Sequence, residues 1–318
     1  MNTRRRPSVN GESPTARGIL RGILYVFAAV LLALAGPSGL LAEEMRKEGP
    51  IVGAAFSYTV RLGDSLVRLG ARFGVAPATL ARLNGLRPNS IIHPDQLLLI
   101  DNRHIVPRHV ALSETGRQIV INVAQRMLFF TDAAGTSAYP IGVGKRDWPT
   151  PLGSFTVIDK EEDPAWDVPP SIQEEMRRQG KPVIERMPPG PENPLGANFI
   201  RLSFRSLGIH GTIEPSSVYR YSTHGCVRMQ PDDIAALYPR VDVGIPGVSV
   251  YEPVLLTAAQ GRVFLEVHSD VYRQAPAPLT YVTGLITGQQ LDERVDWALV
   301  GDTIRDQAGI AVDVTRSD

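Results

Sequence analysis

The chain has 318 residues, of which 43% are hydrophobic and 21% are charged, as in soluble globular proteins rather than disordered or fully membrane-embedded chains. Its 33 basic and 33 acidic residues cancel, which gives no basic field for binding nucleic acid. The 29 glycines and 26 prolines favour a loop-rich, largely β architecture over a helical bundle.

The N-terminus, residues 1–42, has the pattern of an export signal. Five arginines and only one acid, Glu12, precede an uncharged apolar run that begins at Gly22. A basic start followed by such a run is typical of a signal peptide. If the run is not cleaved and continues to Ala42, it is long enough to serve as a membrane anchor. Either way, we expect residues after 43 to lie outside the cytoplasm, in the periplasm or cell envelope, with no other membrane contact.

Residues 57–101 predict a small module of strand, helix, helix and strand. The first strand includes Tyr58, and Gly63-Asp64 provides an N-cap before apolar residues at helical spacing over 66–73. A second helix begins at Pro77, where a first-turn proline is tolerated, and ends at Asn84-Gly85. The stretch 96–100 reads as the closing strand.

This module resembles a LysM domain. Members begin Tyr-Thr-Val, continue Gly-Asp-Ser/Thr-Leu, and later show Leu-Asn and Pro-Gly-Gln. The chain has Tyr58-Thr59-Val60, Gly63-Asp64-Ser65-Leu66, Leu83-Asn84 and Pro94-Asp95-Gln96. It departs from the family at Asp95, where glycine is usual. The resemblance implies binding to the N-acetylglucosamine-containing glycan strands of peptidoglycan or chitin.

Residues 117–252 predict a mainly β domain with antiparallel strands and long loops. Apolar runs of strand length occur at 118–123, 126–131, 137–141, 153–158, 199–204 and 248–252. A tight turn is expected at Ala124-Gln125, and helices are expected near 172–179 and 232–238. The C-terminal extension, 253–318, contains an apolar strand at 261–268 and a predicted helix near 291–300. His268 lies in that strand, and we expect it to be structural.

The chemistry of the chain is concentrated between Ile209 and Met229. Cys226 is the only cysteine, so it cannot form an internal disulfide, and a lone thiol is unusual in an exported protein. A thiol nucleophile needs an imidazole to take its proton and later return it to a leaving amine. His210 and His224 are both candidates, and spacing alone does not choose between them. Gly225 lets backbone N–H groups approach a developing oxyanion.

This stretch is similar to the signature of the YkuD-type L,D-transpeptidases, in which His-Gly-Thr precedes Ser/Thr-x-Gly-Cys-Val/Ile-Arg. Other agreeing segments are Pro140–Gly144, Pro149–Thr156, Asn193–Gly196 and Arg201-Leu202. The resemblance implies an L,D-transpeptidase-like β-sandwich with long loops, and it covers residues 117–252.

Matched residue by residue, the resemblance implies a role for each member of the signature. Cys226 falls on the nucleophile, His210 on the general base and acid, and Gly211 on the backbone carbonyl that orients the histidine. His224 takes a supporting place on the oxyanion side, beside the Gly225 backbone. Thr223 and Arg228 are expected to contact substrate, although Arg228 could instead only brace the loop.

The reaction implied by the resemblance is peptidoglycan L,D-transpeptidation without a metal or cofactor. The cysteine forms a thioester with the third residue of a stem peptide and releases D-alanine. An amine of another stem, or of a lipoprotein, then takes the acyl group. If water takes it instead, the enzyme is an L,D-carboxypeptidase or amidase.

Two alternatives belong to other classes of protein. One is a zinc site formed by His210, His224 and Cys226, although no ligand pair has a usual zinc spacing. The other is a non-catalytic peptidoglycan-binding protein.

Overall fold

The computed structural model describes residues 51–108, 116–205 and 207–317. The predicted signal peptide or anchor, residues 1–42, lies outside the described residues. Within the described ranges, no helix combines the length and the hydrophobicity needed to cross a membrane.

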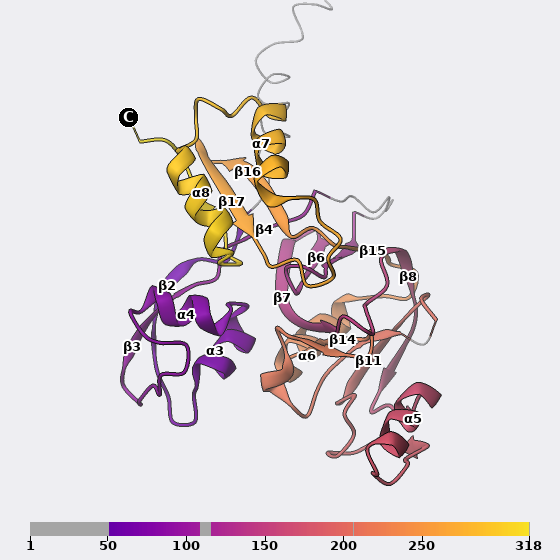
Figure 1. Cartoon of the computed structure of the whole chain (residues 1–318). Coiled ribbons are helices and arrows are strands. Elements are labelled where there is room, and N and C mark those ends of the chain that lie inside the picture. The colour runs from indigo at the N-terminus through magenta and orange to yellow at the C-terminus, as the bar shows by residue number, and fades with distance from the viewer. Residues whose placement is uncertain (1–50, 109–115, 206, 318) are drawn as a thin grey trace, which may run out of the picture. The chain divides into compact units, whose positions relative to one another are not determined.

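The first module follows the predicted order of strand, helix, helix and strand (Figure 1). Its elements are β2 Ala55–Thr59, α3 Leu66–Phe73, α4 Pro77–Leu83 and β3 Leu97–Asp101. The strands pair antiparallel, with Tyr58 opposite Leu98. The cap of α3 differs from the prediction because Ser65, not Asp64, accepts the Arg68 N–H. Asp64 instead accepts the Tyr58 hydroxyl at 2.8 Å and thereby ties the loop to the strand.

The central domain is mainly β, as predicted. Its strands are β5 Gln118–Asn122, β6 Met127–Asp132, β7 Gly135–Gly144, β8 Gly153–Glu162, β11 Asn198–Leu202, β12 Gly208–His210, β13 Tyr221–Thr223, β14 Val227–Met229 and β15 Pro246–Val250. They are ordered β13-β7-β14-β12-β11-β8-β15-β5-β6, and β6 also pairs with β7. Most pairs are antiparallel, as expected, but the sequence did not predict that β5–β15, β12–β14 and β7–β13 are parallel pairs.

Two long strands join the halves of the β-sandwich. β7 pairs with β6 over Thr136–Pro140 and then with β14 from Ile141 onward. β8 pairs with β15 over Gly153–Thr156 and then with β11. The pairings therefore close on themselves and enclose an apolar interior. Its members include Ile119, Phe130, Ile141, Ile200, Ile209 and Val227.

Helices lie outside this interior. α5, Pro170–Arg178, has no buried residue and is flanked in sequence by the short strands β9 Trp166–Asp167 and β10 Arg186–Met187. α6, Pro231–Leu237, buries Ile234 and Leu237, and it is followed by the 3₁₀ turn η2, Tyr238–Arg240. A second 3₁₀ turn, η1 Pro215–Ser217, lies between β12 and β13 in the chain. Both helices occur where the sequence predicted them.

The C-terminal extension forms a small sheet with two helices. Its elements are β16 Val254–Ala259, β17 Arg262–Val267, α7 Pro278–Gly288, α8 Trp297–Asp306 and β18 Val312–Asp313. The helix predicted near 291–300 starts only at Trp297, because Asp296 caps it by accepting two backbone N–H groups. Val295, just before the cap, forms a β-bridge with Thr315 instead. Helix α7 was not predicted.

The extension also completes the core of the first module. Ala308 and Ile310 belong to the same buried cluster as Leu69, Leu80 and Leu98. The Thr79 hydroxyl donates to the Ala308 carbonyl at 2.7 Å inside this cluster. The short strands β1 Ile51–Val52 and β4 His104–Ile105 pair where the module joins the rest of the chain. The module therefore depends on the C-terminus for part of its hydrophobic stabilisation.

Replacing Ile310 with alanine tests this dependence. Ile310 is 4% exposed, so the variant should lose about 2–5 kcal/mol of unfolding free energy in urea. The matched control is Ile158→Ala, because Ile158 is 50% exposed; a surface change of this kind costs about 0.5 kcal/mol or less. Equal losses in the two variants would contradict the shared core.

Candidate active site

The parallel pairing of β12 with β14 brings the predicted catalytic residues to one face of the sheet. Ile209 lies opposite Val227, and His210 lies opposite Arg228. Side chains alternate between the two faces of a strand. Because Ile209 and Val227 point into the apolar core, His210 and Arg228 point out of it. Cys226 directly precedes β14, two residues before Arg228.

His210 is held as a neutral imidazole. Its Nδ1 lies 2.7 Å from the Gly211 carbonyl oxygen, the contact that the family resemblance implied. Because a carbonyl only accepts, Nδ1 carries the hydrogen and Nε2 keeps a lone pair for a proton. The ring of Phe199 stacks on the imidazole at 6.3 Å. Burial, followed by the nearby charge of Arg228, lowers the pKa of His210 to about 4.

Burial of Cys226 favours its protonated thiol form. Burial raises its pKa, and the backbone N–H of Gly208 and the charge of Arg228 only partly oppose this shift. Desolvation therefore disfavours the charged form of both candidate catalytic groups. Burial therefore favours a thiol and a neutral imidazole over a thiolate and an imidazolium.

Thr223 shapes the turn that presents Cys226. Its hydroxyl donates to the Cys226 carbonyl at 2.6 Å and accepts the Gly225 N–H at 3.1 Å. Thr223 is 3% exposed, which favours a role in holding the loop over the predicted contact with substrate. The Gly225 N–H expected for the oxyanion already has a partner in Thr223. The glycine itself is required by its φ of 110°, which other residues rarely adopt.

Two further residues support the turn, and the sequence did not identify them. The Thr150 hydroxyl donates to the Gly225 carbonyl at 2.9 Å and accepts the Gly144 N–H at 2.9 Å. The Tyr272 hydroxyl donates to the Gly144 carbonyl at 2.7 Å and accepts the Thr150 N–H at 3.1 Å. Thr150 stands in the Pro149-Thr-Pro151 segment that matched the family, but nothing in the sequence marked Tyr272 in the C-terminal extension.

His224 is bound to helix α5 rather than to His210. Its Nε2 lies 2.5 Å from a carboxylate oxygen of Glu175, and its ring meets Trp148 edge to face at 5.3 Å. Lys145 approaches the other Glu175 oxygen at 3.4 Å. The hydrogen bond to His224 is the main cause that lowers the pKa of Glu175. These contacts indicate that His224 links the turn before Cys226 to α5.

Arg228 is braced from the loop between β12 and β13. Its Nη1 donates to the Ser217 hydroxyl at 2.9 Å. Gly142 leaves the space for this contact, because a Cβ there would lie 3.3 Å from the Arg228 Cβ and 3.1 Å from the Ser217 carbonyl. Of the two roles considered for Arg228, the structure therefore displays the brace. Its buried Nε has no hydrogen-bond partner among the described residues.

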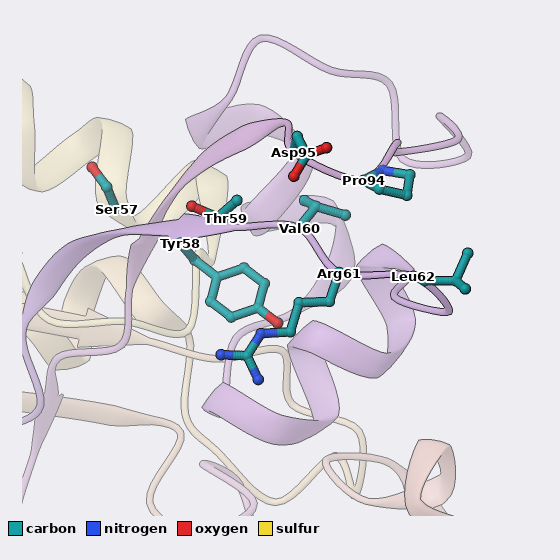
Figure 2. A pocket seen from close by; sticks show the side chains of 8 residues that line it. All are labelled: Ser57, Tyr58, Thr59, Val60, Arg61, Leu62, Pro94 and Asp95. Carbon is teal, nitrogen blue, oxygen red and sulfur yellow. The ribbon is translucent and has the colours of Figure 1, made fainter.

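The LysM-like module carries a separate hollow of about 420 Å³ (Figure 2). Strand β2, from Ser57 to Thr59, and the loop after it form one wall, and Pro94 and Asp95 form another. Asp95, at the position where LysM domains usually have glycine, adopts a φ of 67°. Its N–H still donates to the Val60 carbonyl at 2.9 Å, so the turn forms despite the substitution.

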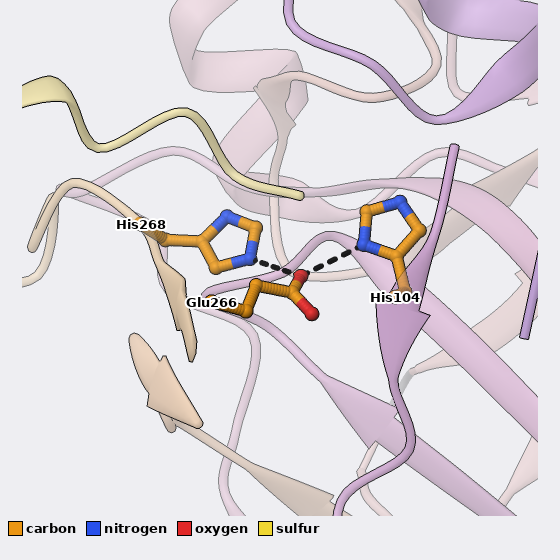
Figure 3. A group of neighbouring side chains, drawn as sticks. All are labelled: His104, Glu266 and His268. Atoms are coloured by element: carbon orange, nitrogen blue, oxygen red, sulfur yellow. Dashed lines mark hydrogen bonds and ion pairs between the residues drawn. The ribbon is translucent and has the colours of Figure 1, made fainter. Parts of the chain in front are cut away.

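The described residues contain one group with converging metal-ligand atoms, namely His104, Glu266 and His268 (Figure 3). One Glu266 oxygen lies 2.7 Å from His104 Nδ1 and 2.7 Å from His268 Nε2, and all three side chains are buried. These are hydrogen-bond distances, and they agree with the structural role expected for His268. The contacts given above keep His210 and His224 on different partners, which argues against the zinc site considered from the sequence.

Comparison with known families agrees with this geometry. Residues 116–251 match the L,D-transpeptidase catalytic domain, YkuD, and residues 58–101 match the LysM domain. The probable L,D-transpeptidase ErfK/SrfK of Salmonella typhimurium is 30% identical over 226 residues, which cover 66% of this chain and 72% of that protein. Its Escherichia coli counterpart is 31% identical over 202 residues, which cover 59% of this chain and 65% of the relative. The chain belongs to the L,D-transpeptidase family.

Solved structures were compared as well. Mycobacterium tuberculosis L,D-transpeptidase 1 shares 22% sequence identity, with a TM-score of 0.30, over 42% of this chain and 61% of that chain. L,D-transpeptidase 3 from the same organism shares 18% identity, with a TM-score of 0.34, over 64% of this chain and 93% of that chain.

The neutral state of the pair predicts how the thiol responds to pH. Because burial raises the pKa of Cys226, its alkylation by iodoacetamide should accelerate with pH and reach its midpoint above the ordinary thiol value of about 8.5. Cys226 is the only cysteine, so Cys226→Ala gives the background. A rate that is already maximal between about pH 5 and 7 would indicate a thiolate–imidazolium pair instead.

Proposed function

We propose that the protein is a cysteine-dependent peptidoglycan L,D-transpeptidase with Cys226 as nucleophile and His210 as general base and acid. The observation that carries this proposal is the β12–β14 pairing, which sets His210 opposite Arg228, two residues after Cys226. No cofactor enters the proposed reaction. Membership of the family supports the class of reaction.

The first half-reaction forms an acyl-enzyme. His210 Nε2 takes the Cys226 proton while the sulfur bonds to the carbonyl carbon of the third stem residue, at its L-centre. The resulting imidazolium then protonates the departing D-alanine amine as the peptide C–N bond breaks, which leaves a thioester. The Gly211 carbonyl stays on Nδ1 throughout and keeps Nε2 directed at the reacting atoms.

The second half-reaction determines the product. A neutral amine from another stem, or from a lipoprotein, attacks the thioester carbonyl. The C–S bond breaks, and the proton that the amine loses passes through His210 to the sulfur. Attack by water in place of the amine gives the carboxypeptidase or amidase outcome, and we propose transfer because it is the activity for which the family is named.

The LysM module and the N-terminal segment also fit a cell-wall substrate. We propose that the LysM module binds peptidoglycan glycan strands through the hollow beside β2. We also propose that residues 1–42 direct export to the periplasm or cell envelope, because of their basic start and apolar run. Thr223 and Gly225 shape the nucleophile turn in this proposal, and His224 attaches the turn to α5.

A disaccharide tetrapeptide incubated with the chain from residue 43 onward tests the reaction. Mass spectrometry should detect loss of D-alanine and a dimer joined between two third-position residues. Cys226→Ala should yield neither product, and His210→Ala should lower the rate by about 10²–10⁴-fold, as expected for loss of general base catalysis. Tripeptide without dimer would favour hydrolysis or an absent acceptor. Unchanged tetrapeptide would contradict the enzyme and favour a peptidoglycan-binding protein.

Sedimentation with purified sacculi tests the glycan site. Leu62 lines the hollow and is 92% exposed, whereas Leu97, in the same module, is 69% exposed and does not line it. Leu62→Ser should reduce co-sedimentation because it removes apolar surface from the proposed site, and Leu97→Ser should retain it. Equal binding by both variants would place the glycan elsewhere.

A further inference from the structure

The C-terminal end of helix α3, in the LysM module, is bound by side chains from outside the module. The last four carbonyls of a helix have no partner within it and must find one elsewhere. Here the Ala71 carbonyl accepts from Gln230 Nε2 at 3.1 Å. The carbonyl of the capping residue Gly74 faces His104 Nε2 at 2.9 Å.

Gln230 connects this helix end to the loop between His210 and Cys226. Besides Ala71, its Nε2 donates to the Pro215 carbonyl at 3.0 Å. Pro215 begins η1, and η1 lies against α3. The backbone of Gln230 is restricted, because Gln230 precedes Pro231 at the start of α6. One amide thus joins the glycan-binding module to the active-site loop.

The same loop carries the brace of Arg228. Ser217, the last residue of η1, accepts from Arg228 Nη1 at 2.9 Å. Arg228 lies opposite His210 in the β12–β14 pair. A continuous chain of contacts therefore runs from Ala71 through Gln230, η1 and Ser217 to Arg228, beside the proposed base.

The buried cluster of His104, Glu266 and His268 provides a second contact to the C-terminal end of α3. His104 is bound on one side to Gly74 and on the other to Glu266, which also accepts the Ile105 N–H at 2.7 Å and the Gln125 side chain at 3.0 Å (Figure 3). Gln125 belongs to the catalytic domain, and Glu266 belongs to the C-terminal extension. The end of α3 therefore stays anchored when Gln230 alone is changed.

We propose that Gln230 is a positioning residue through which the LysM module holds η1, and thereby Arg228, in place beside His210. This inference rests on the proposed function only for its effect on turnover. It makes the glycan-binding module part of the catalytic unit rather than a detachable anchor.

The charges around Arg228 determine how the pKa of His210 would respond if the Arg228–Ser217 contact were lost. Arg228 is the charged group that acts on His210 and lowers its pKa, after the larger effect of burial. Arg228 itself faces Glu214 and Cys226. If the guanidinium moves away from the imidazole, the pKa of His210 should rise by about 1. Burial lowers this pKa as well, so only a variant that keeps the imidazole buried isolates the effect of Arg228.

The test is an NMR pH titration of the histidine side chains in Gln230→Met, a substitution of similar length that removes both hydrogen bonds. The chain has six histidines, and His210→Ala assigns the relevant signal. We expect the His210 midpoint to rise by about 1 in this variant. The acidic limb of kcat/KM on the soluble tetrapeptide should move up with it, with a larger change in kcat than in KM. Gln289→Met, at an exposed glutamine after α7, is the control.

Ser217→Ala removes the brace directly and should raise the His210 midpoint in the same way, even if Gln230→Met does not fold. An unchanged His210 midpoint in folded Gln230→Met would overturn the inference whatever Ser217→Ala shows, and so would an unchanged midpoint in Ser217→Ala if Gln230→Met does not fold. The titration needs no turnover, so it decides the inference even if the wild-type protein leaves the tetrapeptide intact. A tetrapeptide left intact by the wild-type protein would count against the proposed function alone.

Discussion

The parallel pairing of two three-residue strands, β12 and β14, is the constraint on which the site depends. His210 and Cys226 are 16 positions apart in the sequence, and a loop of that length could place them almost anywhere. Pairing Ile209 with Val227 removes this freedom, because both side chains must enter the apolar core. Once they do, the alternation of the strands brings His210 and Arg228 to the opposite face, and Cys226 directly precedes β14.

Burial then sets the chemistry of that face. The same desolvation lowers the pKa of the imidazole and raises the pKa of the thiol, so the resting pair is uncharged. An uncharged pair is stable in a site of low polarity and ionises only as the proton moves. The backbone around Cys226 is fixed by Thr223 and Thr150, and Tyr272 of the C-terminal extension secures Thr150. The extension thus supports the turn that carries Cys226.

Much of the fold could be predicted because the signals are local. Apolar runs and helical spacing identified the LysM strands and helices, six of the central strands, α5 and α6. The strands β12, β13 and β14 have three residues each, too short for a periodic pattern. Parallel pairing was missed because it joins segments far apart in the sequence. Helix α8 was placed too early because the Asp296 cap was overlooked.

The candidate site was predictable only in part, for the same reason. Cys226, His210 and Gly211 stand in a recognisable signature, and the Nδ1 contact to the Gly211 carbonyl is present. Residues that contact the site from distant segments of the chain stand in no such sequence signature. Glu175 reaches His224 from α5, Tyr272 reaches Thr150 from the extension, and Ser217 meets Arg228 across a loop. Gly225 was expected to let backbone N–H groups approach an oxyanion, and its bond to Thr223 could not be foreseen because it forms only in the folded turn.

The central claim is that Cys226 carries the acyl group during turnover, and intact-protein mass spectrometry tests it most directly. The chain is mixed with a stem tetrapeptide that lacks an acceptor amine, quenched in acid within seconds, weighed and digested. The account predicts an added acyl group that ends at the third stem residue, located on the peptide containing Cys226 and released by hydroxylamine. Free D-alanine without any adduct on that peptide, or an adduct elsewhere, would contradict it.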